Sequence, residues 1–71
     1  MRQVAIRNEI RRLRFEQGEM TQQDLAEKIG VTRQTVNAIE QGKYSPSLEA
    51  AFRIAAVFDK PLEGVFHYSK D

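Results

Sequence analysis

The sequence of 71 residues predicts an all-α fold, a compact bundle of five helices around one hydrophobic core. Apolar residues recur three or four positions apart along most of the chain, as they do on one face of a helix. Residues that cap or end helices separate these runs, and no segment shows a clear strand pattern. A chain of this length lies near the lower size limit for folding by apolar burial alone. We therefore expect residues 1–71 to form a single domain.

The first helix is expected from about Gln3 to Gln17, with Gly18 ending it. Its apolar edge would consist of Val4, Ile6, Ile10 and Leu13. Arginines at positions 7, 11 and 14 recur at helical spacing and would give the helix a basic face. That face is either a solvated arginine surface or a strip that binds phosphate.

The next two helices are short and are joined by a tight turn. Thr21 precedes the segment QQDLAEKI and Thr32 precedes RQTVNAIE. A threonine hydroxyl at such a position accepts a hydrogen bond from an unpaired amide of the first helical turn. Gly30 lies between the segments, where the end of a helix often needs a left-handed residue. Each segment has one apolar edge, so most of its surface remains available to another molecule.

Two further helices complete the expected bundle. Ser47 would cap the fourth helix. The apolar stripe of this helix holds Leu48, Ala51, Phe52, Ala55, Ala56 and Phe58. Pro61 fits the first turn of a short fifth helix, LEGVF, and the following HYSKD is expected to be extended or frayed. The C-terminal helix and tail thus span about residues 61–71.

The composition excludes several classes of site. The chain has no cysteine, which rules out disulfides and thiolate metal sites and favours the reducing cytoplasm. No apolar run approaches the roughly 20 residues that a membrane span needs, and no signal-peptide core follows the first residues. The net charge of +1 says little, but residues 1–14 carry five arginines and one glutamate while residues 15–30 are acidic. A nearly neutral protein with this asymmetry presents a basic face when its acids lie on another side.

The chain from Thr21 to Glu40 resembles the phage-repressor-like (Xre/Cro-type) helix-turn-helix regulators. The residues at the family's spacing are Leu25, Ala26, Gly30, Val36 and Ile39, followed by Glu40-Gln41-Gly42-Lys43. The segment SPSLEAAFRIAAVFDKPLEGVF also resembles the family's fourth and fifth helices, so the similarity covers roughly residues 5–67. It implies a lambda-repressor-like five-helix domain, with the helix-turn-helix at about residues 21–41, that binds double-stranded DNA without a cofactor.

The outward face of the second helix of this pair offers side chains that read DNA bases. The residues on that face are Arg33, Gln34, Thr35, Asn37 and Ala38. In the major groove arginine pairs with guanine, glutamine or asparagine pairs with adenine, and a methyl group packs on thymine. A solvated polar face is the alternative, and the resemblance favours base contact. Ala38 departs from relatives that have glutamine there, and it cannot donate a hydrogen bond.

The resemblance also implies contacts with the DNA backbone. Gln22 matches a phosphate-binding position of the family, although a solvent-exposed first-turn residue is the alternative. Thr32, Lys43 and Tyr44 match other backbone-contacting positions. Arg14 and Glu40 match a pair that bridges the first and third helices of relatives.

We therefore expect a sequence-specific transcriptional regulator, by default a repressor, that acts as a homodimer on a near-palindromic operator. Its two recognition helices would lie about 34 Å apart, one turn of DNA. The expected dimer surface consists of Leu62, Val65, Phe66 and Tyr68. The alternative for the first three of these residues is that they close the core of the monomer.

An enzyme and a protein-interaction module are the two other classes of function to consider. The sequence gives little support to an enzyme, because the chain has one histidine, His67, and no glycine-rich phosphate loop. Asp24 and Glu27 lie three apart, but helical acids of this kind are typical of a solvated surface. His67 and Asp71 have no partners nearby to hold a metal ion. The stronger rival is a protein-interaction module, such as an antitoxin, whose partner lies outside this chain.

Overall fold

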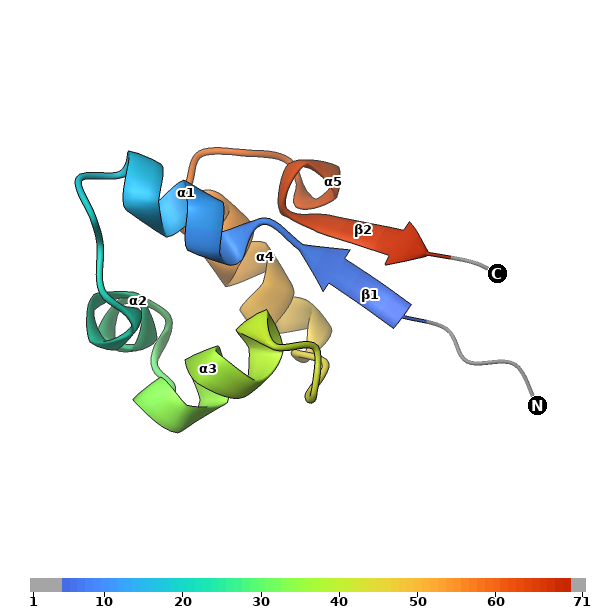
Figure 1. Cartoon of the computed structure of the whole chain (residues 1–71), viewed down its shortest axis with the longest axis horizontal. Coiled ribbons are helices and arrows are strands. Elements are labelled where there is room, and N and C mark those ends of the chain that lie inside the picture. Colours follow the sequence, from blue (N-terminus) through green and yellow to red (C-terminus); the bar gives the residue numbers. More distant parts are fainter. Residues whose placement is uncertain (1–4, 70–71) are drawn as a thin grey trace.

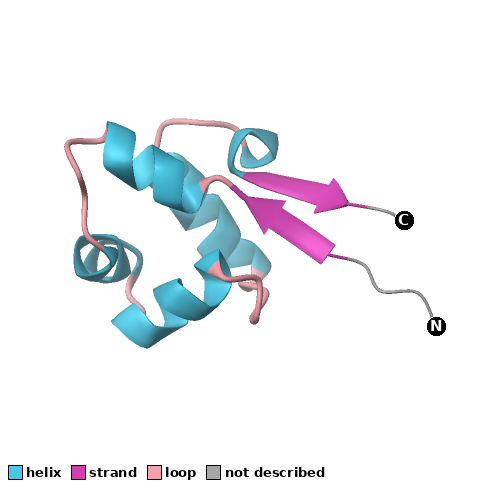
Figure 2. Ribbon diagram, viewed as in Figure 1, coloured by secondary structure: helices cyan, strands magenta, loops and turns pink. Residues whose placement is uncertain are grey.

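The computed structural model describes residues 5–69 as five helices with a short strand at each end of the described chain. The helices are α1 (Ile10–Glu16), α2 (Gln22–Ile29), α3 (Arg33–Glu40), α4 (Leu48–Val57) and α5 (Leu62–Val65). The strands β1 (Ala5–Asn8) and β2 (Phe66–Ser69) pair antiparallel and form a ribbon beside the helices (Figures 1 and 2). The expected five-helix fold is confirmed, with the ribbon added.

The hydrophobic core lies where all five helices meet. Its largest fully buried side chains are Ile10, Leu25, Ile29, Val36, Ile54 and Val65. Ala26 and Ala55 are also buried, and their small side chains let α2 and α4 approach the rest of the core closely. No helix within residues 5–69 is long and apolar enough to cross a membrane.

The predicted helix caps of the central segment are confirmed. Thr21 Oγ1 accepts a hydrogen bond from the Asp24 amide at 2.9 Å, and the Asp24 carboxylate accepts one from the Thr21 amide at 3.1 Å. This reciprocal pair satisfies two amides at the start of α2. Ser47 caps α4 through the amide of Ala50 at 3.1 Å. Gly30 follows α2 with φ of 79°, a left-handed conformation in which other residues are strained.

The prediction that one helix runs from about Gln3 to Gln17 is wrong at its start. Gln3 and Val4 lie outside the described residues, and Ala5–Asn8 form β1 instead of helix. Asn8 stops the strand, because its Oδ1 accepts a hydrogen bond from the Ile10 amide at 3.2 Å. Arg7 lies opposite His67 in the ribbon, so it does not share a helix face with Arg11 and Arg14.

The C-terminal part departs from the prediction in a similar way. Pro61 lies just before α5 with an extended ψ of 163°, not in its first turn, and Phe66 leaves the helix and begins β2. The last two residues of the HYSKD segment lie outside the described range. The predicted apolar stripe of α4 is also too broad, because Leu48 and Phe52 are 69% and 53% exposed. Ile54, absent from that predicted stripe, fills the core instead.

Candidate nucleic-acid interface

The apolar packing of α3 against the core involves one edge of the helix. Val36 and Ile39 are buried, while α3 crosses the end of α2 on the outside of the bundle (Figure 1). Thr32 caps the helix, since its Oγ1 accepts a hydrogen bond from the Thr35 amide at 3.1 Å. The remaining surface of α3 faces away from the core and is available to a ligand.

The start of α3 presents two exposed polar side chains. Arg33 and Gln34 are exposed, and neither side chain forms a hydrogen bond with any other residue in the range 5–69. Thr35, Asn37 and Ala38, the other predicted base-contacting residues, are half-buried. The predicted reading face therefore divides into an exposed start and a more enclosed continuation.

Thr32 and Thr35 share one hydrogen bond between their hydroxyl groups. Their Oγ1 atoms are 2.9 Å apart, and either one can be the donor. Each hydroxyl carries a single hydrogen. While this bond persists, the two threonines together offer only one hydroxyl donor to a ligand.

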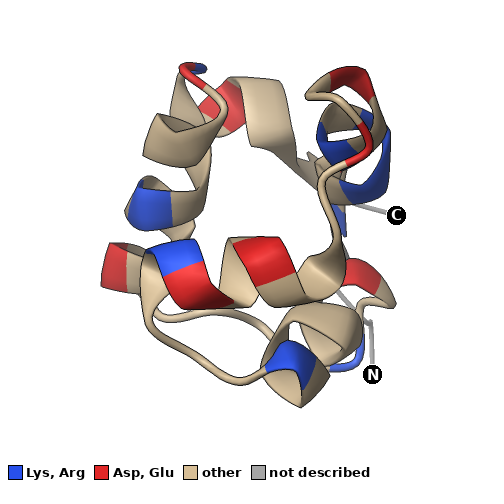
Figure 3. Cartoon of the chain, turned by 90° about the vertical axis from the view of Figure 1, so that its left-hand side faces the viewer, with Lys and Arg blue, Asp and Glu red and all other residues tan. Residues whose placement is uncertain are grey.

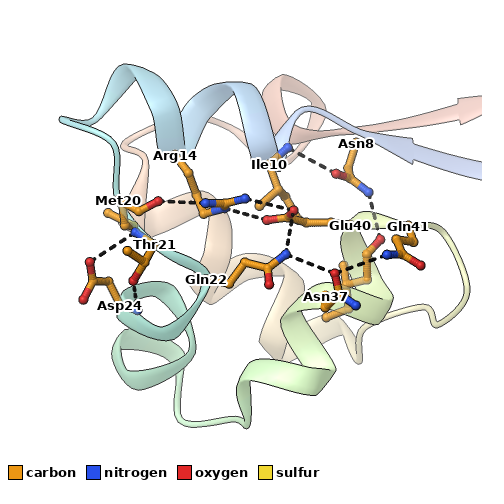
Figure 4. A network of polar contacts seen from close by, with 11 residues as sticks. Asn8, Ile10, Arg14, Met20, Thr21, Gln22, Asp24, Asn37, Glu40 and Gln41 are labelled. Carbon is orange, nitrogen blue, oxygen red and sulfur yellow. Dashed lines mark hydrogen bonds and ion pairs between the residues drawn. The ribbon is translucent and has the colours of Figure 1, made fainter.

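A largely enclosed ion pair joins α1 to the end of α3. Arg14 contacts both carboxylate oxygens of Glu40, with Nε–Oε2 at 2.6 Å and Nη2–Oε1 at 3.1 Å. The two side chains are only 14% and 8% exposed. Arg14 also donates to the carbonyl of Met20 at 2.8 Å, which fixes the loop before α2 (Figure 4). The predicted bridge between the first and third helices is thus confirmed.

Gln22 extends this ion pair toward the outer face of α3. Its Nε2 donates to Glu40 Oε1 at 3.1 Å and to Asn37 Oδ1 at 3.2 Å (Figure 4). Gln41 Nε2 donates to the same Asn37 oxygen at 3.3 Å. Gln41 was not among the predicted site residues, although its spacing of four from Asn37 is the usual signal for a helical side-chain pair.

The end of α3 is also tied to β1. Asn8 Nδ2 donates to the main-chain carbonyl of Ile39 at 3.0 Å. The last turn of α3 is therefore fixed from three sides, by α1 through Arg14, by α2 through Gln22 and by β1 through Asn8. Asn8 has no signal in the sequence, because its role depends on a partner 31 positions away.

The remaining predicted contact residues lie in two places. Lys43 and Tyr44 are exposed in the loop that follows α3. Tyr68 is 66% exposed on the ribbon, opposite Ile6, whereas Leu62 and Phe66 are half-buried. Val65 is completely buried, which favours the alternative that this residue belongs to the core of the monomer.

Among residues 5–69, the charged residues on the side of the molecule seen in Figure 3 are not uniformly basic. The side of the molecule that carries α2 and the preceding loop shows basic and acidic positions intermixed (Figure 3). An open groove of about 950 Å³ lies beside α1 and is lined by Arg11, Arg14, Phe15, Gln22 and Arg33, among others. Arg12 also lines the groove, but it is paired with Glu9 and Glu16, and Arg14 is paired with Glu40. Among the described residues, Arg11 and Arg33 are therefore the arginines of the groove available to an anion.

The start of α1 carries a separate, exposed group of ion pairs. Glu9 lies 3.0 Å from Arg12 Nε and 3.3 Å from His67 Nε2, while Arg12 also contacts Glu16 at 2.9 Å. The hydrogen bond from Arg12 lowers the pKa of the Glu9 carboxyl, and the same bond raises the pKa of Arg12. Within residues 5–69 no group of three histidine, cysteine or acidic side chains is arranged to hold a metal ion.

Comparisons with known proteins agree with this geometry. The sequence profile of a family described as helix-turn-helix matches residues 10–65. An HTH-type transcriptional regulator of Methanocaldococcus jannaschii is 56% identical over 52 residues, which cover 73% of this chain and 79% of that protein. One of Methanothermobacter thermautotrophicus is 48% identical over 67 residues, covering 93% and 96%. The HTH-type regulator YgzD of Bacillus subtilis is 46% identical over 61 residues, covering 86% and 91%.

Proposed function

Because this chain belongs to the Xre/Cro-type helix-turn-helix family of DNA-binding transcriptional regulators, which are not enzymes, we propose that it represses transcription as a homodimer on a near-palindromic operator. The observation that carries the proposal is the exposed start of α3, where the side chains of Arg33 and Gln34 have no hydrogen-bond partner within residues 5–69. A helix with such side chains on its outward face fits the major groove of B-DNA.

We assign the base contacts to the outward face of α3. Arg33 pairs with guanine and Gln34 with adenine, since each has the donor and acceptor pattern that the base edge requires. Thr35 contacts a base edge through its hydroxyl or methyl group, and Ala38 packs on a thymine methyl. Asn37 belongs to the same face.

We assign the backbone contacts to Gln22, Thr32, Lys43 and Tyr44. Both Nε2 hydrogens of Gln22 are already donated within the protein. Its main-chain N–H, in the first turn of α2 where amides lack helical acceptors, is therefore the group that binds a phosphate. Lys43 and Tyr44 are exposed and reach the backbone beyond the end of α3.

The dimer would form through the ribbon and α5. Tyr68 and Ile6 are opposite each other in register, so their exposed side chains share one face of the ribbon. Leu62 and Phe66 are half-buried and shortly precede Tyr68 in the sequence. Val65 is not part of this surface. A second copy of the chain would cover these apolar groups and place a second α3 about one DNA turn away.

Repression would follow from occupation of the operator, which excludes polymerase. The cytoplasm is the compartment that gives access to DNA, and a chain without cysteine is suited to it. Double-stranded DNA is the partner that this site fits.

The test is the selection of bound duplexes from a random library at two salt concentrations. The wild type should enrich an inverted repeat, and Gln34→Ala should lose or change the base preference within each half-site. Gln17→Ala is the matched control, because Gln17 is an exposed glutamine at the end of α1, away from α3. The proposal fails if the wild type enriches no sequence and its weak binding disappears at the higher salt. That result would favour the protein-interaction alternative.

The dimer requires a measurement of its own. Sedimentation of the wild type should show dimers, and Tyr68→Ser should shift the population toward monomers that keep the wild-type circular dichroism spectrum. Lys28→Ser, on the exposed side of α2, is the control. If the wild type is a monomer and still selects an inverted repeat, the ribbon and α5 are not a dimer surface.

A further inference from the structure

The acceptor atom of Asn37 is fully used inside the protein. Its Oδ1 receives hydrogen bonds from Gln22 Nε2 at 3.2 Å and from Gln41 Nε2 at 3.3 Å. An amide oxygen has two lone pairs, so it has no capacity for a third donor. The Nδ2 group of Asn37 bonds to no acceptor within residues 5–69 and keeps both hydrogens for a ligand (Figure 4).

The direction of these hydrogen bonds is set by the ion pair between Arg14 and Glu40. Glu40 forms an ion pair with Arg14, and a carboxylate only accepts hydrogen bonds. The side chain of Gln22 must therefore turn its NH2 group, not its oxygen, toward Glu40. The second hydrogen of that NH2 group then points at Asn37, which has to present its oxygen.

From this polarity we propose that the hydrogen-bonded series Arg14–Glu40–Gln22 fixes Asn37 as a hydrogen-bond donor only. Gln22 thereby determines which DNA groups Asn37 can bind, without touching the base itself. The proposal rests on the proposed function and deepens it. An asparagine that recognises adenine must accept from N6 and donate to N7. Asn37 cannot do both, because its oxygen is occupied. It donates instead to an acceptor on DNA, either a base atom such as guanine O6 or a phosphate oxygen.

The polarity itself is tested on the free protein by NMR. The side-chain NH2 hydrogens of Gln22 should exchange slowly with solvent, whereas those of Asn37 should exchange as fast as those of the exposed Gln34. In Gln22→Ala, the Asn37 resonances should shift, and in the matched control Gln23→Ala they should remain unchanged. Slow exchange at Asn37 with fast exchange at Gln22 would overturn the proposal, whatever the protein binds.

The consequence for recognition is tested on the selected operator. Asn37→Ala should weaken binding by about two- to tenfold, the usual effect of one lost hydrogen bond. A change confined to one base position identifies a base acceptor, and a uniform loss identifies a phosphate oxygen. Each adenine is then replaced in turn by purine, which lacks the N6 amino group. No replacement should lower the affinity of the wild type by more than it lowers the affinity of the Asn37→Ala variant.

The positioning role of Gln22 has a separate readout. Gln22→Ala releases one lone pair of Asn37, so the variant should gain tolerance for adenine where Asn37 contacts DNA, and Gln23→Ala should not. The proposal is overturned if Gln22→Ala keeps the wild-type preference at every base. It is also overturned if the loss of an adenine N6 group weakens DNA binding by the wild type but not by the Asn37→Ala variant. A wild type that selects no operator fails the proposed function instead, and the exchange experiment still decides the polarity of Asn37.

Discussion

The two halves of α3 differ in how firmly their polar side chains are held. At its start, Arg33 and Gln34 are exposed and unpaired within the described residues. At its end, Glu40 and Asn37 are fixed by partners from α1, from α2 and from Gln41, which directly follows α3. The fixed half sets the position of the helix, while the free half has the exposed donors and acceptors that we propose contact DNA. We therefore expect substitutions in the two halves to separate stability from binding.

Loss of the enclosed ion pair should have the largest effect. Arg14→Ala leaves the Glu40 carboxylate, which is only 8% exposed, without its charged partner. We expect the free energy of unfolding to fall by about 3 kcal/mol or more, measured by urea denaturation. Arg12→Ala, in the same helix but in an exposed ion-pair group, should cost much less. Equal losses in the two variants would contradict the assignment of the end of α3 as the structural half.

Removal of the exposed arginine should have the opposite pattern. Arg33→Ala should leave the free energy of unfolding within about 0.5 kcal/mol of the wild type, as for most surface substitutions. Affinity for the selected operator should fall by about 1–3 kcal/mol, the usual contribution of a bidentate base contact. Fluorescence anisotropy with labelled duplex measures this loss. A destabilised Arg33→Ala with unchanged affinity would reverse the comparison.

The residue that caps α3 should affect both properties. Thr32→Ala removes the acceptor for the Thr35 amide and should cost about 1 kcal/mol of stability. Thr32→Ser, which keeps the hydroxyl, should lose little. Thr21→Ala removes an equivalent cap from α2 and should destabilise the protein by a similar amount. Only the Thr32 variant should also bind the operator more weakly than its stability explains, as shown by titrations well below the melting temperature.

The smallest expected effect concerns the exposed ion pairs at the start of α1. The hydrogen bond from Arg12 lowers the pKa of Glu9 in the folded protein relative to the unfolded chain. The stabilisation of the folded protein by this hydrogen bond is thus complete above the ordinary glutamate pKa of about 4.3. It disappears as the pH falls through the lower pKa of Glu9 in the folded state. Glu9→Gln should flatten the acid side of the melting-temperature profile slightly. Glu63→Gln, an exposed control, should not, and identical profiles for all three proteins would show that this ion pair contributes nothing.

Local sequence chemistry predicted the central helices well. Thr21, Gly30, Thr32 and Ser47 act within their own turn, so their neighbours in the sequence contain the whole signal. The bounds predicted for α2 and α3 are those that the structure has. The Arg14–Glu40 pair was predictable from the resemblance alone, since its members lie 26 positions apart.

The ribbon was not predictable in the same way. Ile6 and Ile10 are four residues apart and fit a helix, so the periodicity alone extends the first helix too far. What makes Ala5–Asn8 a strand is its pairing with Phe66–Ser69, at the other end of the described chain. Val4 and Ile6 alternate as in a strand, but the polar Asn8 ends this pattern, which is too short to outweigh the helical spacing.

The candidate site was predictable as a face but not as a network. Gln22 is predictable as a DNA-contacting residue because it matches a contact position of the family, and Asn37 because it lies on the outward face of its helix. The hydrogen bonds from Gln22 to Asn37 and Glu40, and the one from Gln41 to Asn37, are not predictable in this way. Hydrogen-bond direction depends on the three-dimensional order of the partners, and the sequence does not contain that order explicitly.

The most direct test is an NMR titration of the isotope-labelled protein with its selected duplex. The largest changes in amide and side-chain resonances should occur at Arg33 and Gln34, with smaller ones at Gln22 and Lys43. Resonances of Leu48 and Phe52 on α4 should move little. Changes centred on α4, with the start of α3 unaffected, would contradict the account, because DNA would then bind a face other than the one presented by α3.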